Sequence, residues 1–318
     1  MNIQSRLSRV SIRHPLAALS LIGMLGAPLA DAATRTVNER VAAESRGSVE
    51  IVNTSGRVSV TGWDRPEVTV TGTLEEGVER LEVSSSGGKT VIRVIQRKSS
   101  PARWKSGEAV LDIRVPTESR LNVAVVSADL DLRQLRGEQI LSTVSGDVDA
   151  ELGAEAAART VSGDLRLAAK AATRRLEIST ASGDVKVSGS AGGRVEVRTV
   201  SGDAEFALGS VTDAEFKSVS GNLALRLALE PTGRLAVESV SGTVDIDFAS
   251  PPAARFQLRS FSGGIDLCPG VRPKTSAADG GDPFAGQRRE FQSGDGQGRV
   301  EVQTMSGDIK LCVPGQAR

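Results

Sequence analysis

The tripeptide Ser-Gly-Asp in RTVSGDAEF, residues 198–206, recurs along the chain in nearly the same frame. A serine precedes the glycine each time, and a threonine or serine stands three positions before it. The eight repeat glycines are Gly146, Gly163, Gly183, Gly202, Gly221, Gly242, Gly263 and Gly307. Six of their seven spacings lie between 17 and 21 residues, and the last is 44. A repeat of this kind decides the architecture before length or composition does.

Each repeat contains two short strands. Apolar residues stand two and four positions after the glycine, as in Val185 and Val187, and seven and five positions before it, as in Leu176 and Ile178. This spacing has the period of two that indicates a strand. One unit of about 19 residues cannot bury its own apolar face, but copies stacked about 4.8 Å apart build a continuous core. The pattern predicts an all-β fold, a β-solenoid of stacked two-strand rungs.

The alternation changes phase just before the glycine. The Thr or Ser three positions before it keeps the parity of the upstream strand, whereas the next residue, as in Val144, Val200, Phe261 and Met305, starts the parity of the downstream strand. We therefore expect a bend at the Thr-Val step that brings both apolar sets into one core. Glycine allows unusual backbone angles there, and Ser and Asp can bond turn amides. Antiparallel hairpins of a β-sandwich are the alternative, but turn chemistry alone would not repeat this phase change eight times.

The pattern also sets the domain boundaries. The rung motif extends upstream to Ala128 and Gly56, with a less regular region between them. We predict an N-terminal β cap and first rung over residues 33–120, because an open solenoid end is a sheet edge that must be covered. The repeat domain then covers residues 121–318, with a loop insertion at 269–298 around Phe284.

The first 32 residues are typical of an export signal. Arg6, Arg9 and Arg13 precede an apolar run from Leu16 to Leu29, and Ala30-Asp31-Ala32 has the small-x-small form of a cleavage site. The alternative is an amphipathic N-terminus of a cytoplasmic protein. After the signal, no segment approaches the roughly 18 continuous apolar residues of a membrane helix, so no membrane span is expected.

Composition excludes several functions. Residues 1–32 hold three arginines and one aspartate, so the 39 basic and 39 acidic residues of the whole chain become 36 and 38. A net charge near zero does not favour nucleic acid as a partner. The only histidine, His14, lies in the predicted signal. A Ser-His-Asp triad, a Cys-His dyad and histidine-containing metal sites are therefore excluded, and no cofactor is expected.

Cys268 and Cys312 share one phase of the repeat, because each stands five residues after a repeat glycine. If residues 269–298 loop out, the two rungs become neighbours. Their Cα separation is then near 4.8 Å, inside the range of a disulfide. In an oxidising compartment we expect this bond to form.

Four segments carry a resemblance to a known family: GRVSVTGWDRPEVTV at 56–70, LDIRVP at 111–116, the serial TVSGD units, and SGDGQGRVEVQTMSGDIKL at 293–311. In this order they resemble the bacterial "putative adhesin" proteins, catalogued as a domain of unknown function. The resemblance covers nearly all of the mature chain. It implies a secreted β-strand repeat with a binding role, and it supplies no catalytic residues.

Charged residues also follow the repeat. Glu177, Glu196 and Glu215 share the position six before the glycine, while Arg159, Arg198, Lys217 and Arg259 share the position four before it. We predict a possible binding face made of Glu177, Glu196, Glu215, Arg198 and Lys217, for an envelope protein or a glycan. An ordinary solvated sheet surface is the alternative.

Two further sets of acids have functional alternatives. The residue after the glycine is acidic in Asp147, Asp164, Asp184, Asp203 and Asp308, with Asn222 in the same row. These carboxylates can cap the turns or, stacked, hold calcium. Asp245, Asp247 and Asp266 could serve a glycan-cleaving β-helix, but such an enzyme needs an acid-base pair in a cleft.

The sequence thus predicts an exported, non-enzymatic envelope protein, located in the periplasm or on the cell surface. Its predicted role is adhesin-like binding or scaffolding. A periplasmic structural protein without a ligand is one alternative, and a carboxylate-dependent glycan-active enzyme is another.

Overall fold

The computed structural model describes residues 34–97, 107–169, 173–268 and 286–314. These residues belong to one compact unit, Ala33–Arg318. The predicted signal and Phe284 lie outside the described residues. The described part is all-β, and within it no helix has the length and hydropathy that crossing a membrane requires.

Twenty-two strands are present in the described residues, all joined in one hydrogen-bonded sheet. They are β1 (Arg35–Ala42), β2 (Ser48–Trp63), β3 (Glu67–Leu74), β4 (Val78–Ser86), β5 (Lys89–Gln96), β6 (Ala109–Pro116), β7 (Arg120–Arg133), β8 (Gln139–Ser142), β9 (Val148–Glu151), β10 (Glu155–Thr160), β11 (Leu165–Ala169), β12 (Arg175–Thr180), β13 (Val185–Gly189), β14 (Gly193–Thr199), β15 (Ala204–Ser218), β16 (Leu223–Ser241), β17 (Val244–Phe248), β18 (Ala254–Ser260), β19 (Ile265–Leu267), β20 (Gln287–Gln292), β21 (Gly298–Ser306) and β22 (Ile309–Cys312).

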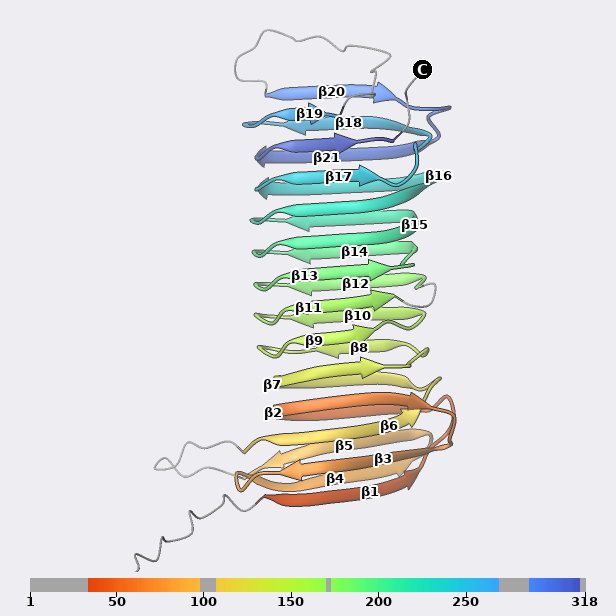
Figure 1. Ribbon diagram of the computed structural model, residues 1–318, viewed down its shortest axis with the longest axis vertical. Helices are drawn as coiled ribbons and strands as arrows, with labels where there is room; N and C mark the ends of the chain where they lie inside the picture. Colours follow the sequence, from red (N-terminus) through yellow and green to blue (C-terminus); the bar gives the residue numbers. More distant parts are fainter. Residues whose placement is uncertain (1–33, 98–106, 170–172, 269–285, 315–318) are drawn as a thin grey trace, which may run out of the picture. The chain divides into compact units, whose positions relative to one another are not determined.

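Successive repeats pair in parallel and in register (Figure 1). The strands upstream of the repeat glycines form one ladder, in which β8, β10, β12 and β14 follow one another. The downstream strands form a second ladder, in which β9, β11, β13 and the first part of β15 follow one another. We call one upstream strand and its downstream strand a rung. This parallel pairing is incompatible with antiparallel hairpins between successive repeats.

The core lies between the two ladders. The alternating apolar residues of both strands are buried, for example Leu176 and Ile178 of β12 and Val185 and Val187 of β13. Toward the C-terminal rungs phenylalanines enlarge this core, and the rings of Phe206 and Phe216 meet edge to face with centroids 5.0 Å apart. Such burial is the main favourable contribution to folding, because apolar area leaves water along every rung.

The bend between the two strands differs from the prediction. The Thr or Ser three positions before the glycine is buried as expected, but the apolar residue after it points to solvent. These exposed residues lie in one row, which we call the apolar ridge. In spatial order the ridge consists of Val126, Val144, Val161, Ala181, Val200, Val219, Val240, Met305 and Phe261. The expectation that they enter the core was wrong.

A buried hydroxyl explains where the bend falls. Thr143 Oγ1 accepts a hydrogen bond from the N–H of Gly146 at 3.0 Å, and Thr180 Oγ1 donates to the carbonyl of Ser182 at 3.2 Å. In six rungs the hydroxyl thus ties the inside of the turn to its own backbone, and Ser260 instead donates to the carbonyl of Gly307 in the adjacent rung. Because a buried hydroxyl needs such a partner, the chain turns one residue later than the apolar pattern suggests.

The residues after the repeat glycines form a ladder of side-chain to backbone hydrogen bonds, which we call the aspartate ladder. Asp164 donates its N–H to the carboxylate of Asp147 at 3.1 Å, and Asp203 donates to Asp184 at 2.9 Å. Asn222 continues the row by donating to Asp203 at 2.8 Å. Among the residues that the structure places, no three acidic, histidine or cysteine side chains are grouped as a metal site would need. The geometry matches the turn-capping interpretation of these acids.

The glycine is required because neighbouring corners approach closely. Gly221 has a φ angle of 112°, in a region that residues with a side chain rarely adopt. A Cβ built on Gly221 would lie 2.2 Å from the carbonyl oxygen of Gly202 in the adjacent rung. Gly221 is therefore needed both for its backbone angle and for the distance between rungs.

At both ends the order of strands in space departs from the order in sequence. The first rung, in β2, lies between β7 on one side and β5 and β6 on the other. Antiparallel strands continue beyond it, because β3 pairs with β6 and β1 pairs with β3. The second half of β7 carries Ala128 beside Gly56 of β2, as the rung motif suggests.

The last rung is also internal. Strand β21 lies between β16 and β18, and β22 lies between β17 and β19 (Figure 1). Cys268 and Cys312 are joined by a disulfide with a Cα separation of 4.9 Å, so the predicted bond is present. Part of the segment predicted to loop out is a strand, because β20 pairs antiparallel with β18. The rest of that segment, residues 269–285, lies outside the described residues.

Replacing Gly221 by alanine should destabilise the protein by about 2 to 5 kcal/mol, from backbone strain plus overpacking. Gly87 is a matched control, because it also has a positive φ, 57°, but a Cβ there meets nothing within 4 Å. Gly87→Ala should cost only the strain, about 1 to 2 kcal/mol. Chemical denaturation of both variants measures the difference, and equal losses would show that rung spacing does not require the glycine.

Candidate functional site

The outward side chains of the upstream strands form the charged face. Glu177 of β12, Glu196 of β14 and Glu215 of β15 pair in register across three adjacent strands. Arg198 and Lys217 pair in the same way two residues further along. The five residues proposed from the sequence as a binding face are therefore brought together on one surface. Their rows run perpendicular to the strands because every rung repeats the same alternation.

Ion pairs link the two rows of the charged face. Lys217 Nζ lies 2.7 Å from Glu215 Oε1 and 3.7 Å from Glu238 Oε2. Arg198 pairs with Glu196 on its own strand. Within the glutamate row the acid is the more enclosed partner, since the side chain of Glu196 is 17% exposed against 53% for Arg198. Pairs of this kind contribute little to stability, about 0 to 1 kcal/mol each, so their arrangement matters more as a pattern of charge.

The charges of this face shift one another's ionisation. A hydrogen bond from Lys217 holds the pKa of Glu215 below its ordinary value, against the opposing effect of partial burial. The Lys217 pKa is raised, chiefly by the same hydrogen bond to Glu215 and then by the charge of Glu238. Both groups therefore stay ionised over a wider pH range than isolated side chains do.

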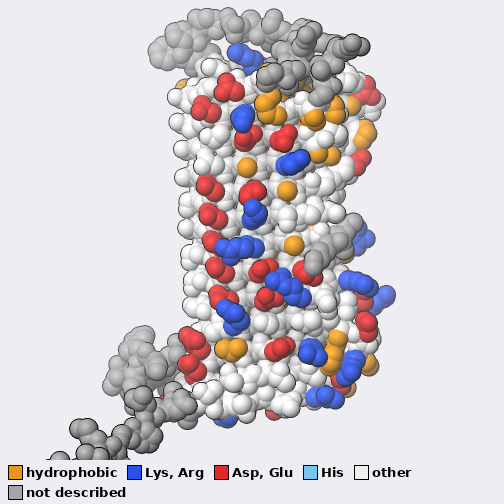
Figure 2. Space-filling model, in the orientation of Figure 1, with side chains coloured by type: hydrophobic (Ala, Val, Ile, Leu, Met, Phe, Trp, Pro, Cys, Tyr) orange, Lys and Arg blue, Asp and Glu red, His pale blue; other side chains and the backbone are white. Residues whose placement is uncertain are grey.

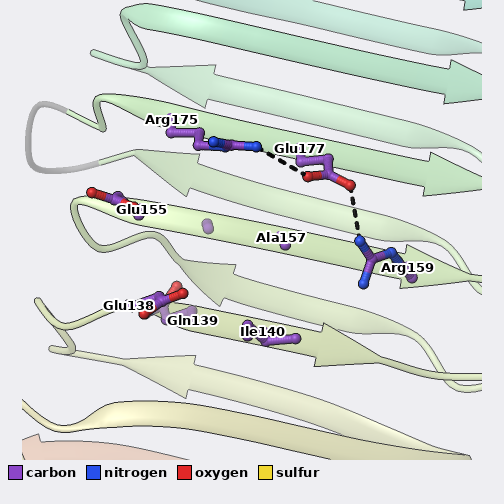
Figure 3. A pocket seen from close by; sticks show the side chains of 9 residues that line it. Glu138, Gln139, Ile140, Glu155, Ala157, Arg159, Arg175 and Glu177 are labelled. Carbon is purple, nitrogen blue, oxygen red and sulfur yellow. Dashed lines mark hydrogen bonds and ion pairs between the residues drawn. The ribbon is translucent and has the colours of Figure 1, made fainter.

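A hollow of about 240 Å³ interrupts the charged face where the glutamate row ends. Figure 3 shows Glu177 held between Arg175 and Arg159, with ion-pair distances of 3.8 and 2.9 Å. In the next rungs the row continues with Ala157 and Ile140, which carry no charge. The small alanine leaves space between charged neighbours, so the hollow has an uncharged floor and a charged rim.

The structure separates one residue of the basic repeat position from the others. Arg259 of β18 shares the repeat position of Lys217, but Glu238 of β16 and Gln303 of β21 lie between them in register. Glu238 stands between them in sequence order as well, and the insertion of β21 adds Gln303. A continuous basic row along all rungs is therefore absent from the described residues, and the basic character is concentrated at Arg198 and Lys217.

The acids considered for glycan cleavage are not arranged as a pair. Lys310 of β22 lies between Asp245 and Asp266 in register, and its Nζ is 3.2 Å from Asp245 Oδ2. Asp247 lies 3.9 Å from Arg226. Cleavage by the usual mechanism needs two carboxyl groups facing one bond across a cleft, whereas here a cation stands between them.

The sequence analysis missed the apolar ridge and a second hollow at its end. This hollow measures about 530 Å³ and is bordered by Val240, Phe261 and Met305, with basic residues such as Arg259 and Arg288 at its edge. The repeat supplied only part of the signal. A Thr or Ser already occupies the last inward position, so the apolar residue beside it had to face outward unless the strand stopped earlier.

Residues 49–312 match a protein family described as Toastrack DUF4097. The chain belongs to this family. The resemblance proposed from the sequence, to proteins catalogued as a domain of unknown function, is thereby confirmed. No protein with a curated functional description matches this Toastrack chain.

The solved structures that match this chain come from several bacteria. A "putative adhesin" of Bacteroides fragilis is 13% identical, with a TM-score of 0.43, and the match covers 87% of this chain and 96% of that one. A "putative cell adhesion protein" of Clostridium sporogenes is 10% identical, with a TM-score of 0.25 and coverage of 88% and 99%. A "putative lipid binding protein" of Parabacteroides distasonis is 9% identical, with a TM-score of 0.31 and coverage of 87% and 96%. At these values the likeness does not carry a ligand over to the Toastrack chain.

Replacing Lys217 by methionine should raise the pKa of Glu215 toward its ordinary value, because the largest cause of the lowering is removed. Arg198→Met is the matched control and should raise it less, since Arg198 acts only through its charge. A carbon-13 NMR titration of the Glu215 carboxyl measures both shifts. Equal shifts in the two variants would contradict the assigned cause.

The lowered pKa of Glu215 also makes the stability of the folded protein depend on pH. The pKa of Glu215 is lower in the folded protein than in the unfolded chain. Ionised Glu215 therefore stabilises the fold at pH values above its pKa in the unfolded chain, and this stabilisation is lost as the pH falls through its pKa in the folded protein. The difference in melting temperature between wild type and Glu215→Gln should therefore narrow on acidification.

Proposed function

We propose that this Toastrack protein is an exported, non-enzymatic scaffold of the bacterial envelope that binds a partner through its charged face. The scaffold is a β-solenoid, with β1, β3 and β4 as a cap at one end and β20 covering the other. One observation carries the proposal: Glu177, Glu196 and Glu215 lie in register beside Arg198 and Lys217 across consecutive strands. Rigid, periodic charge of this kind favours a partner with a complementary charged surface.

An envelope protein fits this face better than a glycan does. The face offers carboxylates and cations, and its uncharged floor consists of Ala157 and Ile140 rather than aromatic rings. Aromatic rings are the side chains that bury the most area at a contact, and Trp63, which two arginines approach, belongs to a strand outside this face. The proposed partner is therefore a protein recognised through charge and hydrogen bonds.

Export is supported by the disulfide. Cys268 and Cys312 are bonded, and stable disulfides belong mainly to oxidising compartments. The signal-like residues 1–32 agree with this assignment. The proposed location is the periplasm or the cell surface. A structural protein without a ligand is the competing function, and the experiment below distinguishes the two.

The binding test compares two neutralised ion pairs. In the charged-face variant, Glu215→Gln is combined with Lys217→Gln, which removes a pair 2.7 Å apart. In the control, Lys186→Gln is combined with Glu205→Gln, which removes a pair with the same 2.7 Å separation on the downstream strands. The affinity of the purified protein for envelope vesicles prepared from its native bacterium should weaken about tenfold, or about 1.4 kcal/mol, in the charged-face variant and stay unchanged in the control.

Salt provides an internal check on that test, because exposed charges are screened within about 8 Å at physiological ionic strength. Wild-type binding should fall as salt is added, and the charged-face variant should respond less. Equal binding of both variants would remove the charged face as the binding site and favour the structural role.

Export is tested separately by protease treatment of intact and lysed cells, followed by detection with an antibody to the mature chain. We expect either digestion on intact cells, which indicates the surface, or protection until the outer barrier is opened, which indicates the periplasm. Recovery of the chain with cytosolic markers would contradict export, whatever the result of the binding test.

A further inference from the structure

The apolar ridge is an unusual surface because its members are consecutive. Isolated exposed apolar residues are common on soluble proteins, but contiguous rows are not. Here the exposed fraction is 45% at Val144, 53% at Val200 and 60% at Phe261. Each member belongs to a different rung, so the chain has kept an apolar residue at this exposed position through nine rungs in space.

The ridge is held straight by the backbone. Ser162 donates its N–H to the carbonyl of Val144 at 2.9 Å, and Ser220 donates to Val200 at 2.9 Å. The same bond recurs between the inserted rung and its neighbour, where Ser262 donates to Met305 at 2.8 Å. Ridge residues therefore repeat at the strand separation of about 4.8 Å, and nine of them span about 40 Å.

The two flanks of the ridge carry opposite charge. On the upstream side lie four bases, Arg159, Arg198, Lys217 and Arg259, two residues before their ridge neighbours, and one acid, Glu238, interrupts this row. On the downstream side lies the aspartate ladder, whose acids follow one another along the stack, and Figure 2 shows acidic side chains in such a line. Two rungs present base, apolar residue and acid in that order: Arg159, Val161 and Asp164 in one, and Arg198, Val200 and Asp203 in the other.

This arrangement is self-complementary for one symmetry only. A two-fold axis parallel to the stack sets two ridges side by side in the same direction, so that each basic flank faces the partner's acidic flank. A two-fold axis perpendicular to the stack reverses one copy and sets base against base. Isologous contacts of the first kind are the ordinary route to a dimer.

The size of the surface suits a dimer. The ridge with its two flanks covers about 40 Å by about 20 Å, near the roughly 800 Å² per partner of a standard interface. Both partners have the same 4.8 Å repeat, so every rung can meet its equivalent. We propose that the apolar ridge is the interface of a parallel homodimer, in which each ridge residue faces the same residue of a second copy.

A ridge variant and a matched control test the association. Val200→Asp combined with Val219→Asp would bury four carboxylates in the dimer and should raise its Kd at least about a hundredfold. Val110→Asp is the control, because Val110 is exposed to a similar extent, 48%, but lies on β6, two strands beyond the end of the ridge at Val126 and outside the ridge. Sedimentation over a concentration series of the purified protein should show a wild-type dimer, an unchanged control and a monomeric ridge variant.

Folding of each variant is checked by circular dichroism and thermal melting. If the double aspartate variant does not fold, Val200→Thr with Val219→Thr keeps the shape of the side chains and should weaken the dimer less strongly. A wild-type protein that stays monomeric at every concentration would overturn the proposal. So would a dimer that both ridge variants leave unchanged.

Orientation is tested with single cysteines. In the parallel dimer, Val144→Cys, Val200→Cys and Val240→Cys should each form a symmetric disulfide with the second copy, whereas Val110→Cys should not. In an antiparallel dimer only the central position, Val200, would cross-link. Cross-linking at all three ridge positions supports the proposed symmetry, and cross-linking at Val200 alone overturns it.

A lipid surface is the other occupant that an apolar ridge suggests. Co-sedimentation with phosphatidylcholine vesicles distinguishes it from a second copy. A monomeric wild type that binds vesicles, and loses binding in the ridge variant, would overturn the dimer in favour of a membrane. A dimer that does not bind vesicles supports the proposal. The basic flank shares Arg198 and Lys217 with the charged face, but the ridge variants leave both residues unchanged, so the dimer and the binding of an envelope partner are tested by different substitutions.

Discussion

Each corner of this protein bonds to the next through the backbone, and the serine before the repeat glycine donates in nearly every rung. This bond fixes the register of the two strands that leave the corner. Once the register is fixed, every repeat position becomes a row along the stack. The buried hydroxyls, the aspartate ladder, the apolar ridge and the glutamates of the charged face are all rows of this kind, created by one constraint.

Rows of like side chains have electrostatic consequences. Neighbouring carboxylates about 4.8 Å apart repel one another by roughly 3 kcal/mol at an effective dielectric of 20. The aspartate ladder offsets this repulsion with a backbone N–H donated to each carboxylate by the next rung. The glutamate row offsets it with cations on the same or adjacent strands, as Lys217 does for Glu215. Repulsion between stacked carboxylates is thus offset by backbone N–H groups in the aspartate ladder and by basic side chains in the glutamate row.

At the two ends of the stack the main constraint is the unpaired backbone edge of the sheet. A parallel ladder exposes unpaired backbone groups at each end, and these promote aggregation unless covered. In this protein β2 and β21 lie inside the ladder. Strand β6, which follows β2 in sequence, lies outside β2, and β18, which precedes β21 in sequence, lies outside β21. Antiparallel strands such as β20 then pair with the outermost parallel strand. The disulfide between Cys268 and Cys312 joins the displaced rung to its neighbour.

The sequence by itself determined the strands, the two-strand repeat and the phase shared by Cys268 and Cys312, because side-chain alternation and repeat spacing are local properties. It also placed Glu196 and Arg198 on one outward face, since both follow from parity alone. Tertiary structure decided that Val200 faces solvent, because the position of a bend depends on which hydroxyl finds a backbone partner inside the turn. It decided, too, that β21 lies between β16 and β18. Every rung has nearly the same backbone edge, so the local sequence pattern cannot specify which rungs are neighbours. The order of the rungs depends instead on how the two end edges of the sheet are covered.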